Sequence, residues 1–137
     1  MAKWLAGIVA AVIAGVVVLW IAESGSLTPL DVSGLSTPSG KGYVVEDDSG
    51  LRSGAKAYTD RQYPYSVVPS ELEGKTYIQT ANDDKFSKGE KFLSFSINKP
   101  ATVYVGHDTR YQKKPSWLSQ YVNTGLFLRD CLFRQFL

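Results

Sequence analysis

An uninterrupted apolar run near the amino terminus constrains this chain more than any other feature. Residues 4–22 contain no charged or strongly polar side chain. A helix over this run is about 28 Å long, close to the roughly 30 Å hydrocarbon core of a bilayer. Trp4 and Trp20 stand near its two ends, where indole rings favour the lipid headgroup region. The run predicts a single N-terminal transmembrane helix within residues 1–22.

The charges around this run predict its orientation. Lys3 precedes it, whereas Glu23 and Asp31 follow it. The positive-inside rule then puts the amino terminus in the cytoplasm and the rest of the chain in the periplasm or outside the cell. A cleaved signal peptide is the alternative, with a small-x-small site at Ala22-Glu23-Ser24. The run is longer than the usual apolar segment of such a peptide, which favours a retained anchor.

The composition limits the remaining classes of function. The chain has 137 residues and a formal net charge of +2. Such a balance argues against nucleic-acid binding, which needs a clustered excess of Lys and Arg. A single cysteine, Cys131, excludes an internal disulfide, and one His with one Cys falls short of a structural zinc site. We therefore expect no nucleic-acid partner and no cofactor.

The rest of the chain is typical of a β domain behind a linker. Residues 23–42 are rich in Ser, Gly, Pro and Thr, which predicts a flexible spacer. From there on, apolar residues come in short groups separated by turn residues, a strand pattern. The expected strands are Tyr43–Val45, Ala55–Thr59, Tyr65–Val68, Thr76–Thr80, Phe92–Ile97 and Ala101–Val105.

One pair of these strands suggests a hairpin. Phe92–Ile97 alternates apolar and serine residues, as expected for a strand with one buried face. Asn98-Lys99-Pro100 then predicts a tight turn into Ala101–Val105. Pro115–Leu118 is suited to open one helical turn. Short strands without a long amphipathic helix favour a mainly β fold, an antiparallel, jelly-roll-like β-sandwich over residues 43–125.

The tail, residues 126–137, has a different pattern. Leu128, Leu132 and Phe136 are spaced four residues apart, as on one face of a helix. An amphipathic helix lying on the membrane or on the domain is one interpretation. A final strand with an irregular end is the other.

Three short segments carry a resemblance to a known kind of module: Tyr77–Asp84, Val103–Asp108 and Pro115–Leu118. With them, the region from Tyr58 to Gly125 resembles an uncharacterised β-sandwich module of secreted and surface proteins of environmental bacteria. That module often lies beside carbohydrate-active domains, and it has no catalytic residues to carry over. Modules of this kind continue with further strands, whereas this chain ends twelve residues after Gly125. The resemblance therefore implies an incomplete, C-terminally truncated sandwich.

Aromatic residues are the main signal of binding. Tyr111, Trp117 and Tyr121 lie in a Lys- and Pro-containing segment where we expect exposed rings. Exposed rings with polar edges are suited to stack on the apolar faces of sugars. Most other rings, Tyr77 and Tyr104 among them, are expected in the core. These three aromatic residues are therefore candidate ligand-binding residues.

Polar residues next to a predicted strand complete the candidate site. His107, Asp108 and Arg110 are suited to bind a ligand, or to serve acid–base chemistry. Adjacent residues on an extended chain point in opposite directions, so His107 and Asp108 need not touch. No nucleophile motif accompanies them. A structural interpretation, in which Asp108 caps a turn and pairs with Arg110, is favoured over catalysis.

An acidic turn offers a weak metal candidate. Asn82, Asp83 and Asp84 supply several oxygen atoms, the ligand type that calcium prefers. Their spacing is not that of an EF-hand loop, and such residues favour turns for local reasons. We therefore predict no metal site.

Together these observations favour a membrane-anchored, extracytoplasmic module that binds a glycan or cell-surface polymer and is not an enzyme. The alternative is a single-pass structural or assembly subunit. Gly7, Ala11 and Gly15 form a small-residue stripe in the apolar run that permits close helix packing. A hydrolase that uses His107 is the least favoured hypothesis.

Overall fold

The computed structural model describes residues 17–23, 30–87, 93–110, 116–130 and 135–136. In these residues the chain is mainly β, and all ladders between its strands are antiparallel. Two short 3-10 helices, η1 (Asn82–Phe86) and η2 (Ser116–Gln120), interrupt the strands. The strands are β1 (Val17–Glu23), β2 (Val32–Ser36), β3 (Val44–Glu46), β4 (Tyr65–Val67), β5 (Thr76–Gln79), β6 (Ser94–Ile97), β7 (Ala101–His107), β8 (Leu128–Asp130) and β9 (Gln135–Phe136).

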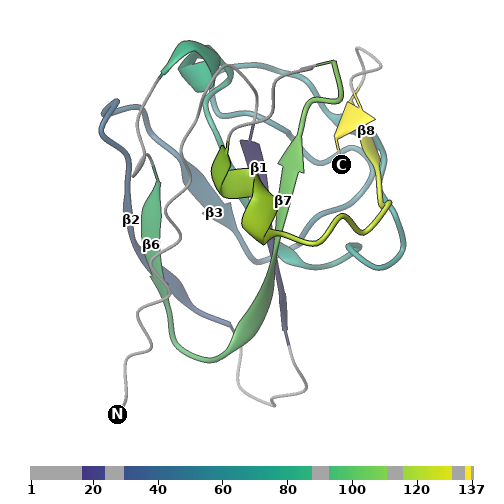
Figure 1. The fold of residues 1–137 in the computed structure, drawn as a ribbon, viewed down its shortest axis with the longest axis horizontal. Coiled ribbons are helices and arrows are strands. Elements are labelled where there is room, and N and C mark those ends of the chain that lie inside the picture. Colours follow the sequence, from purple (N-terminus) through teal and green to yellow (C-terminus); the bar gives the residue numbers. More distant parts are fainter. Residues whose placement is uncertain (1–16, 24–29, 88–92, 111–115, 131–134, 137) are drawn as a thin grey trace.

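The strands form three sheets. The largest has the order β3-β5-β1-β7, so β1 lies between β5 and β7, and β7 forms one edge. A two-stranded sheet joins β2 to β6, and the two lie side by side in Figure 1. The third sheet has the order β4-β8-β9.

The prediction of a transmembrane helix within residues 1–22 is wrong for residues 17–22, which form part of a strand. Residues 17–22 belong to β1, which pairs along its length with β7, from Val17 opposite His107 to Glu23 opposite Ala101. The segment VVLWI is rich in β-branched and aromatic residues, which favour strands, and an apolar run alone does not separate a buried strand from a helix. Cleavage of a signal peptide at Ala22-Glu23-Ser24 stays a prediction from the sequence.

Within the residues that the structure describes, no helix is long and apolar enough to cross a membrane. Residues 1–16 lie outside the described residues, and with them the small-residue stripe of Gly7, Ala11 and Gly15.

Two hydrophobic clusters fill the described part of the fold. The strand-built cluster consists of Leu30, Ile78, Leu93, Phe95 and Ile97, with partly buried residues of β2, β3 and β7 packed against it. The loop-built cluster consists of Leu51, Ala55, Ala57, Tyr58, Tyr65, Leu72, Tyr77 and Leu128. Strand β5 contributes to both, because its neighbouring residues Tyr77 and Ile78 point to opposite faces of the sheet.

The segment expected to be a flexible spacer contains part of the fold. Strand β2 lies within residues 23–42 and pairs with β6, with Val32 opposite Ile97. Leu30, just before β2, is only 4% exposed. A Ser- and Gly-rich composition therefore did not exclude a strand here, because the few apolar residues of the segment reach the strand-built cluster.

The prediction that Phe92–Ile97 and Ala101–Val105 form a hairpin is wrong. Strand β6 pairs with β2, whereas β7 pairs with β1, so the turn connects two different sheets. The side chain of Asn98 explains this, because its Oδ1 accepts a hydrogen bond from the backbone N–H of Asp31 at 2.9 Å. The N–H of Asn98 in turn donates to the carbonyl of Asp31 at 3.2 Å. These bonds hold the turn to the start of β2.

Most other expected strands are present with shifted ends, as β3, β4, β5 and β7. The segment Ala55–Thr59 forms only isolated bridges, Lys56 to Pro64 and Tyr58 to Thr80. In the tail, Leu128–Asp130 forms β8 and pairs with β4, so the strand interpretation applies to these residues. Leu128 is buried in the loop-built cluster, which accounts for the strand. Leu132 and Cys131 lie outside the described residues.

Candidate functional site

A cavity of about 610 Å³ lies along the outer edge of β7, and we call it the β7 cavity. One wall is β7 itself, and the other consists of η2 and residues 121–124. Figure 1 shows η2 lying across β7. The cavity forms at this place because β7 is an edge strand of its sheet and no further strand of the described chain pairs with its outer side.

Strand β7 supplies both apolar and polar side chains to this cavity. Val103 and Val105 also pack against the strand-built cluster, whereas Tyr104 packs against the loop-built cluster. Alternating residues of a strand point to opposite faces, so a cavity that follows the edge of β7 meets residues from both. Tyr104, which the sequence suggested as a core residue, is half-buried and lines the cavity.

The segment that forms the opposite wall contains an aromatic pair, of which Tyr121 lines the cavity and Trp117 does not. The rings of Trp117 and Tyr121 meet edge to face, with centroids 6.1 Å apart and an interplanar angle of 82°. Trp117 packs against the strand-built cluster, and its indole N–H has no hydrogen-bond partner among the described residues. Tyr121 lines the cavity, and burial raises its pKa above the ordinary value. Its hydroxyl therefore stays protonated at neutral pH and is able both to donate and to accept a hydrogen bond.

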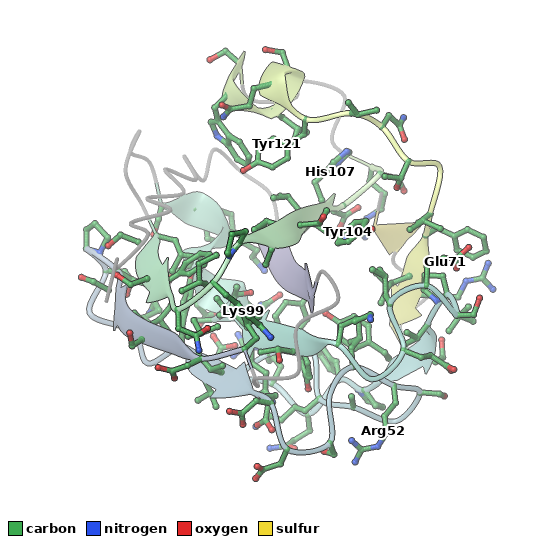
Figure 2. All side chains as sticks on the ribbon, turned by 90° about the horizontal axis from the view of Figure 1, so that it is seen from below. Arg52, Glu71, Lys99, Tyr104, His107 and Tyr121 are labelled. Atoms are coloured by element: carbon green, nitrogen blue, oxygen red, sulfur yellow. The ribbon has the colours of Figure 1, made fainter. Side chains whose placement is uncertain are left out.

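His107 is the last residue of β7, and its imidazole lines the cavity. The ring is half-buried, and its Nδ1 lies 3.2 Å from the carbonyl oxygen of Asp108. Figure 2 shows His107 near Tyr104 and Tyr121, three rings from two segments of the chain. The structure thus brings His107 and Tyr121 to one site.

Asp108 and Arg110 serve the turn after β7. The Asp108 carboxylate is 1% exposed, and its Oδ1 accepts hydrogen bonds from the backbone N–H and the Nε of Arg110, both at 2.9 Å. Nη2 of Arg110 donates to Oδ2 at 2.5 Å. These contacts confirm the structural interpretation, and neither residue lines the β7 cavity. Tyr111, the remaining candidate of this segment, lies outside the described residues.

The acidic turn considered for calcium uses its oxygen atoms within the protein. Asp84 is 2% exposed, and its carboxylate accepts hydrogen bonds from the hydroxyls of Ser39 at 2.9 Å, Tyr43 at 2.8 Å and Ser87 at 3.3 Å. Burial raises the pKa of Tyr43 strongly, and the hydrogen bond to Asp84 raises it further. Asp83 forms an ion pair with Arg61.

The carboxylate of Asp60 caps the N-terminus of η1. Asp60 accepts hydrogen bonds from the backbone N–H groups of Asn82, at 2.7 Å, and Asp83, at 3.0 Å. Burial raises the pKa of Asp60, but these two N–H groups and the Arg61 guanidinium outweigh burial and hold that pKa below its ordinary value. In the described ranges, no three His, Cys, Asp or Glu side chains are grouped so that they would hold a metal ion.

Sequence reasoning missed the polar lining of the β7 cavity. Thr102, Ser116, Ser119, Asn123 and Thr124 all face it. These are ordinary surface residue types, and nothing in their spacing connects β7 to the segment after η2. The one available signal was their position beside the aromatic candidates.

Comparison with known proteins finds a partial similarity. The chain is 36% identical over 72 residues to a beta-glucuronidase of Formosa agariphila. The matched region makes up 53% of this chain and 7% of that enzyme, so the chain spans only a small part of the relative's length. No protein-family model matches the chain. No solved structure matches it either.

Proposed function

We propose that this chain is a non-catalytic carbohydrate-binding domain that holds a glycan or cell-surface polymer in the β7 cavity. The observation that carries the proposal is the lining of the cavity. Tyr104 and Tyr121 supply aromatic surface from two sides, and His107, Asn123 and Ser119 supply hydrogen-bonding groups beside them. A sugar presents the same two kinds of surface, apolar C–H faces and hydroxyl edges.

Size and similarity support this proposal. The volume of about 610 Å³ lies in the range of small-molecule sites, roughly 300–1,000 Å³. The matched relative is named as a glycosidase, and the match covers a small part of its length. An accessory domain of a carbohydrate-active protein fits both facts.

The lining also supports binding over catalysis. Glycoside hydrolysis in most families needs two carboxyl groups that flank the glycosidic bond. The cavity lining, as far as the structure describes it, contains no Asp or Glu. The carboxylate next to His107 belongs to Asp108, which is buried and bound to Arg110.

We further propose that the two-stranded β2–β6 sheet and the four-stranded sheet form a β-sandwich. Strands β2 and β6 face β5 and β7 across the strand-built cluster, to which all four contribute. Location outside the cytoplasm and a surface-protein partner remain predictions from the sequence. We do not propose the membrane anchor, because residues 17–22 form β1.

Affinity electrophoresis of the full chain in gels that contain xylan, laminarin or alginate tests the proposed function. We expect one of these polysaccharides to retard the protein, and Tyr121→Ala to weaken retardation about tenfold, or about 1.4 kcal/mol. Phe86→Ala is the matched control, because Phe86 is an aromatic residue that is 76% exposed and does not line the cavity.

Two results would overturn the proposal. One is retardation that both variants reduce equally, because the cavity would then have no special role. The other is hydrolysis of 4-nitrophenyl β-D-glucuronide by the natural chain that is lost in His107→Ala, which would indicate an enzyme.

A further inference from the structure

A second pocket lies over strands β3 and β5 and the segment of residues 49–59, and we call it the β3–β5 pocket. It has a volume of about 380 Å³. Figure 2 shows Arg52, which lines it, on the opposite side of the molecule from His107 and Tyr121. The β3–β5 pocket shares no lining residue with the β7 cavity, so it is a separate site.

The floor of this pocket is an ordered chain of polar groups. Gln79 is 6% exposed, and its Nε2 donates hydrogen bonds to Oε1 of Glu46 at 2.9 Å and to the Tyr77 hydroxyl at 3.3 Å. The Tyr77 hydroxyl donates to the carbonyl of Lys56 at 3.0 Å. Among the described residues, these bonds leave the amide oxygen of Gln79 and Oε2 of Glu46 as acceptors for a ligand.

Two cations border this floor. Nη1 of Arg52 donates to the carbonyl of Gly50 at 3.4 Å, and Nζ of Lys56 donates to the carbonyl of Thr59 at 3.3 Å. Each bond is long and uses one of several donors, so both side chains are positioned while further N–H groups stay available. With Glu46 the three side chains carry a net charge of +1.

The Tyr77 hydroxyl belongs to this polar chain, and its pKa responds to charges on both sides. Burial raises the pKa of Tyr77, the hydrogen bond from Gln79 lowers it, and the charges of Glu46 and Arg52 act on it in opposite directions. Glu46, Arg52 and Lys56 line the same pocket as Tyr77. The pocket presents cationic donors and anionic acceptors within one small volume.

From this arrangement we propose that the β3–β5 pocket binds a sugar that carries a carboxylate. The carboxylate lies against Arg52 and Lys56, since a guanidinium matches a carboxylate with two parallel hydrogen bonds. The sugar hydroxyls donate to Glu46 and Gln79. A phosphate dianion fits less well, because the Glu46 carboxylate repels its double negative charge more strongly than the single charge of a carboxylate.

NMR titration of the ¹⁵N-labelled full chain with sodium D-glucuronate tests this site. We expect chemical-shift changes confined to residues 44–59 and 77–79, and binding at least tenfold weaker with neutral methyl β-D-glucopyranoside. Acetate, which lacks the hydroxyls, is expected to bind at least tenfold more weakly as well.

Variants assign the binding to the proposed groups. Arg52→Gln and Lys56→Gln should each weaken glucuronate binding at least tenfold, whereas Lys41→Gln, an exposed cation outside the pocket, should leave it unchanged. The proposal is overturned if the neutral glucoside or acetate binds as tightly as glucuronate. It is also overturned if Arg52→Gln leaves the affinity for glucuronate unchanged, or if the shift changes occur at Tyr104 and Tyr121 instead.

The same experiments keep the two sites apart. Tyr121→Ala should weaken polysaccharide retardation about tenfold and leave the glucuronate-induced shift changes intact. If no polysaccharide binds but glucuronate still changes the chemical shifts of residues 44–59, the proposal for the β7 cavity is wrong and that for the β3–β5 pocket stands.

Discussion

The two hydrophobic clusters of this fold are built by different means. The strand-built cluster takes three of its five members, Ile78, Phe95 and Ile97, from β5 and β6, and partly buried residues of β2 and β7 pack against it. The backbones of these strands are held by ladders. The loop-built cluster takes several of its members, such as Leu51, Ala57 and Leu72, from segments between strands. The backbone there is fixed by close approaches and single hydrogen bonds. We therefore expect the strand-built cluster to be sensitive to side-chain volume and the loop-built cluster to be sensitive to backbone geometry.

The largest effect should come from Gly50→Ala beside the loop-built cluster. Gly50 has φ +61°, and a Cβ there would lie 2.5 Å from the backbone carbon and oxygen of Gly74. Strain and overlap together should lower the free energy of unfolding by about 4 kcal/mol. Urea denaturation followed by circular dichroism measures the loss.

Gly54→Ala is the matched control for this substitution. Gly54 also has a positive φ, +84°, but nothing lies within 4 Å of its added Cβ. Only the strain remains, so the loss should be about 1 kcal/mol. Equal losses in the two variants would show that the contact between Gly50 and Gly74 does not hold this backbone.

The next largest effect should come from Phe95→Ala in the strand-built cluster. Phe95 is 3% exposed, and its removal leaves a cavity between β6 and the larger sheet. We expect a loss of about 3 kcal/mol in guanidinium denaturation. Phe86→Ala, on an exposed ring, should change stability by less than about 0.5 kcal/mol. A small loss of stability in Phe95→Ala would contradict the expectation that the strand-built cluster is sensitive to side-chain volume.

A smaller effect is expected for Tyr43→Phe, which removes one donor to Asp84. At neutral pH the loss should be about 1 kcal/mol. The pKa of Tyr43 is raised in the folded state, so the folded chain keeps this proton when the unfolded chain has lost it. That contribution is present below the ordinary tyrosine pKa of about 10 and is lost as pH rises above it. Thermal melts at pH 8 and 11 should therefore show a larger decrease for the natural chain than for Tyr43→Phe.

The smallest effect concerns Asp60, which ties the end of the segment Ala55–Thr59 to η1. Its folded-state pKa lies below the ordinary value of 3.8, so its contribution is present above that value and is lost as pH falls. The contribution should be less than about 1 kcal/mol, because the side chain is partly exposed. Asp60→Asn should flatten the decrease in stability between pH 5 and pH 2 in thermal melts. An unchanged slope would mean that Asp60 does not link these segments.

Local patterns in the sequence predicted the strands better than their partners. The alternation in Phe92–Ile97 identified β6, because period two depends only on one buried face. The hairpin failed because the partner of Asn98 is Asp31, far away in the chain. The apolar run at the amino terminus was misassigned because its residue types suit a buried strand as well as a membrane helix.

The candidate sites show the same limit. Tyr121 and His107 were found from residue type, and the segment after β7 brought them close to each other. The β3–β5 pocket was missed entirely, because Glu46, Arg52 and Gln79 come from three segments and each has an ordinary surface residue type. The pairing of β3 with β5 brings Glu46 close to Gln79, and the segment of residues 49–59 adds Arg52.

The position of β1 in the middle of its sheet has a consequence for how the chain is made. β1 is the first described strand to leave the ribosome, yet both of its neighbours, β5 and β7, are synthesised much later. Until Thr76–Gln79 has emerged, both hydrogen-bonding edges of this apolar strand stay open to other chains, and one edge stays open until Ala101–His107 follows. Folding dominated by such distant pairing is slow, and the waiting strand is prone to aggregate. Production of this protein should therefore depend on chaperones and on the rate of synthesis more than its small size suggests.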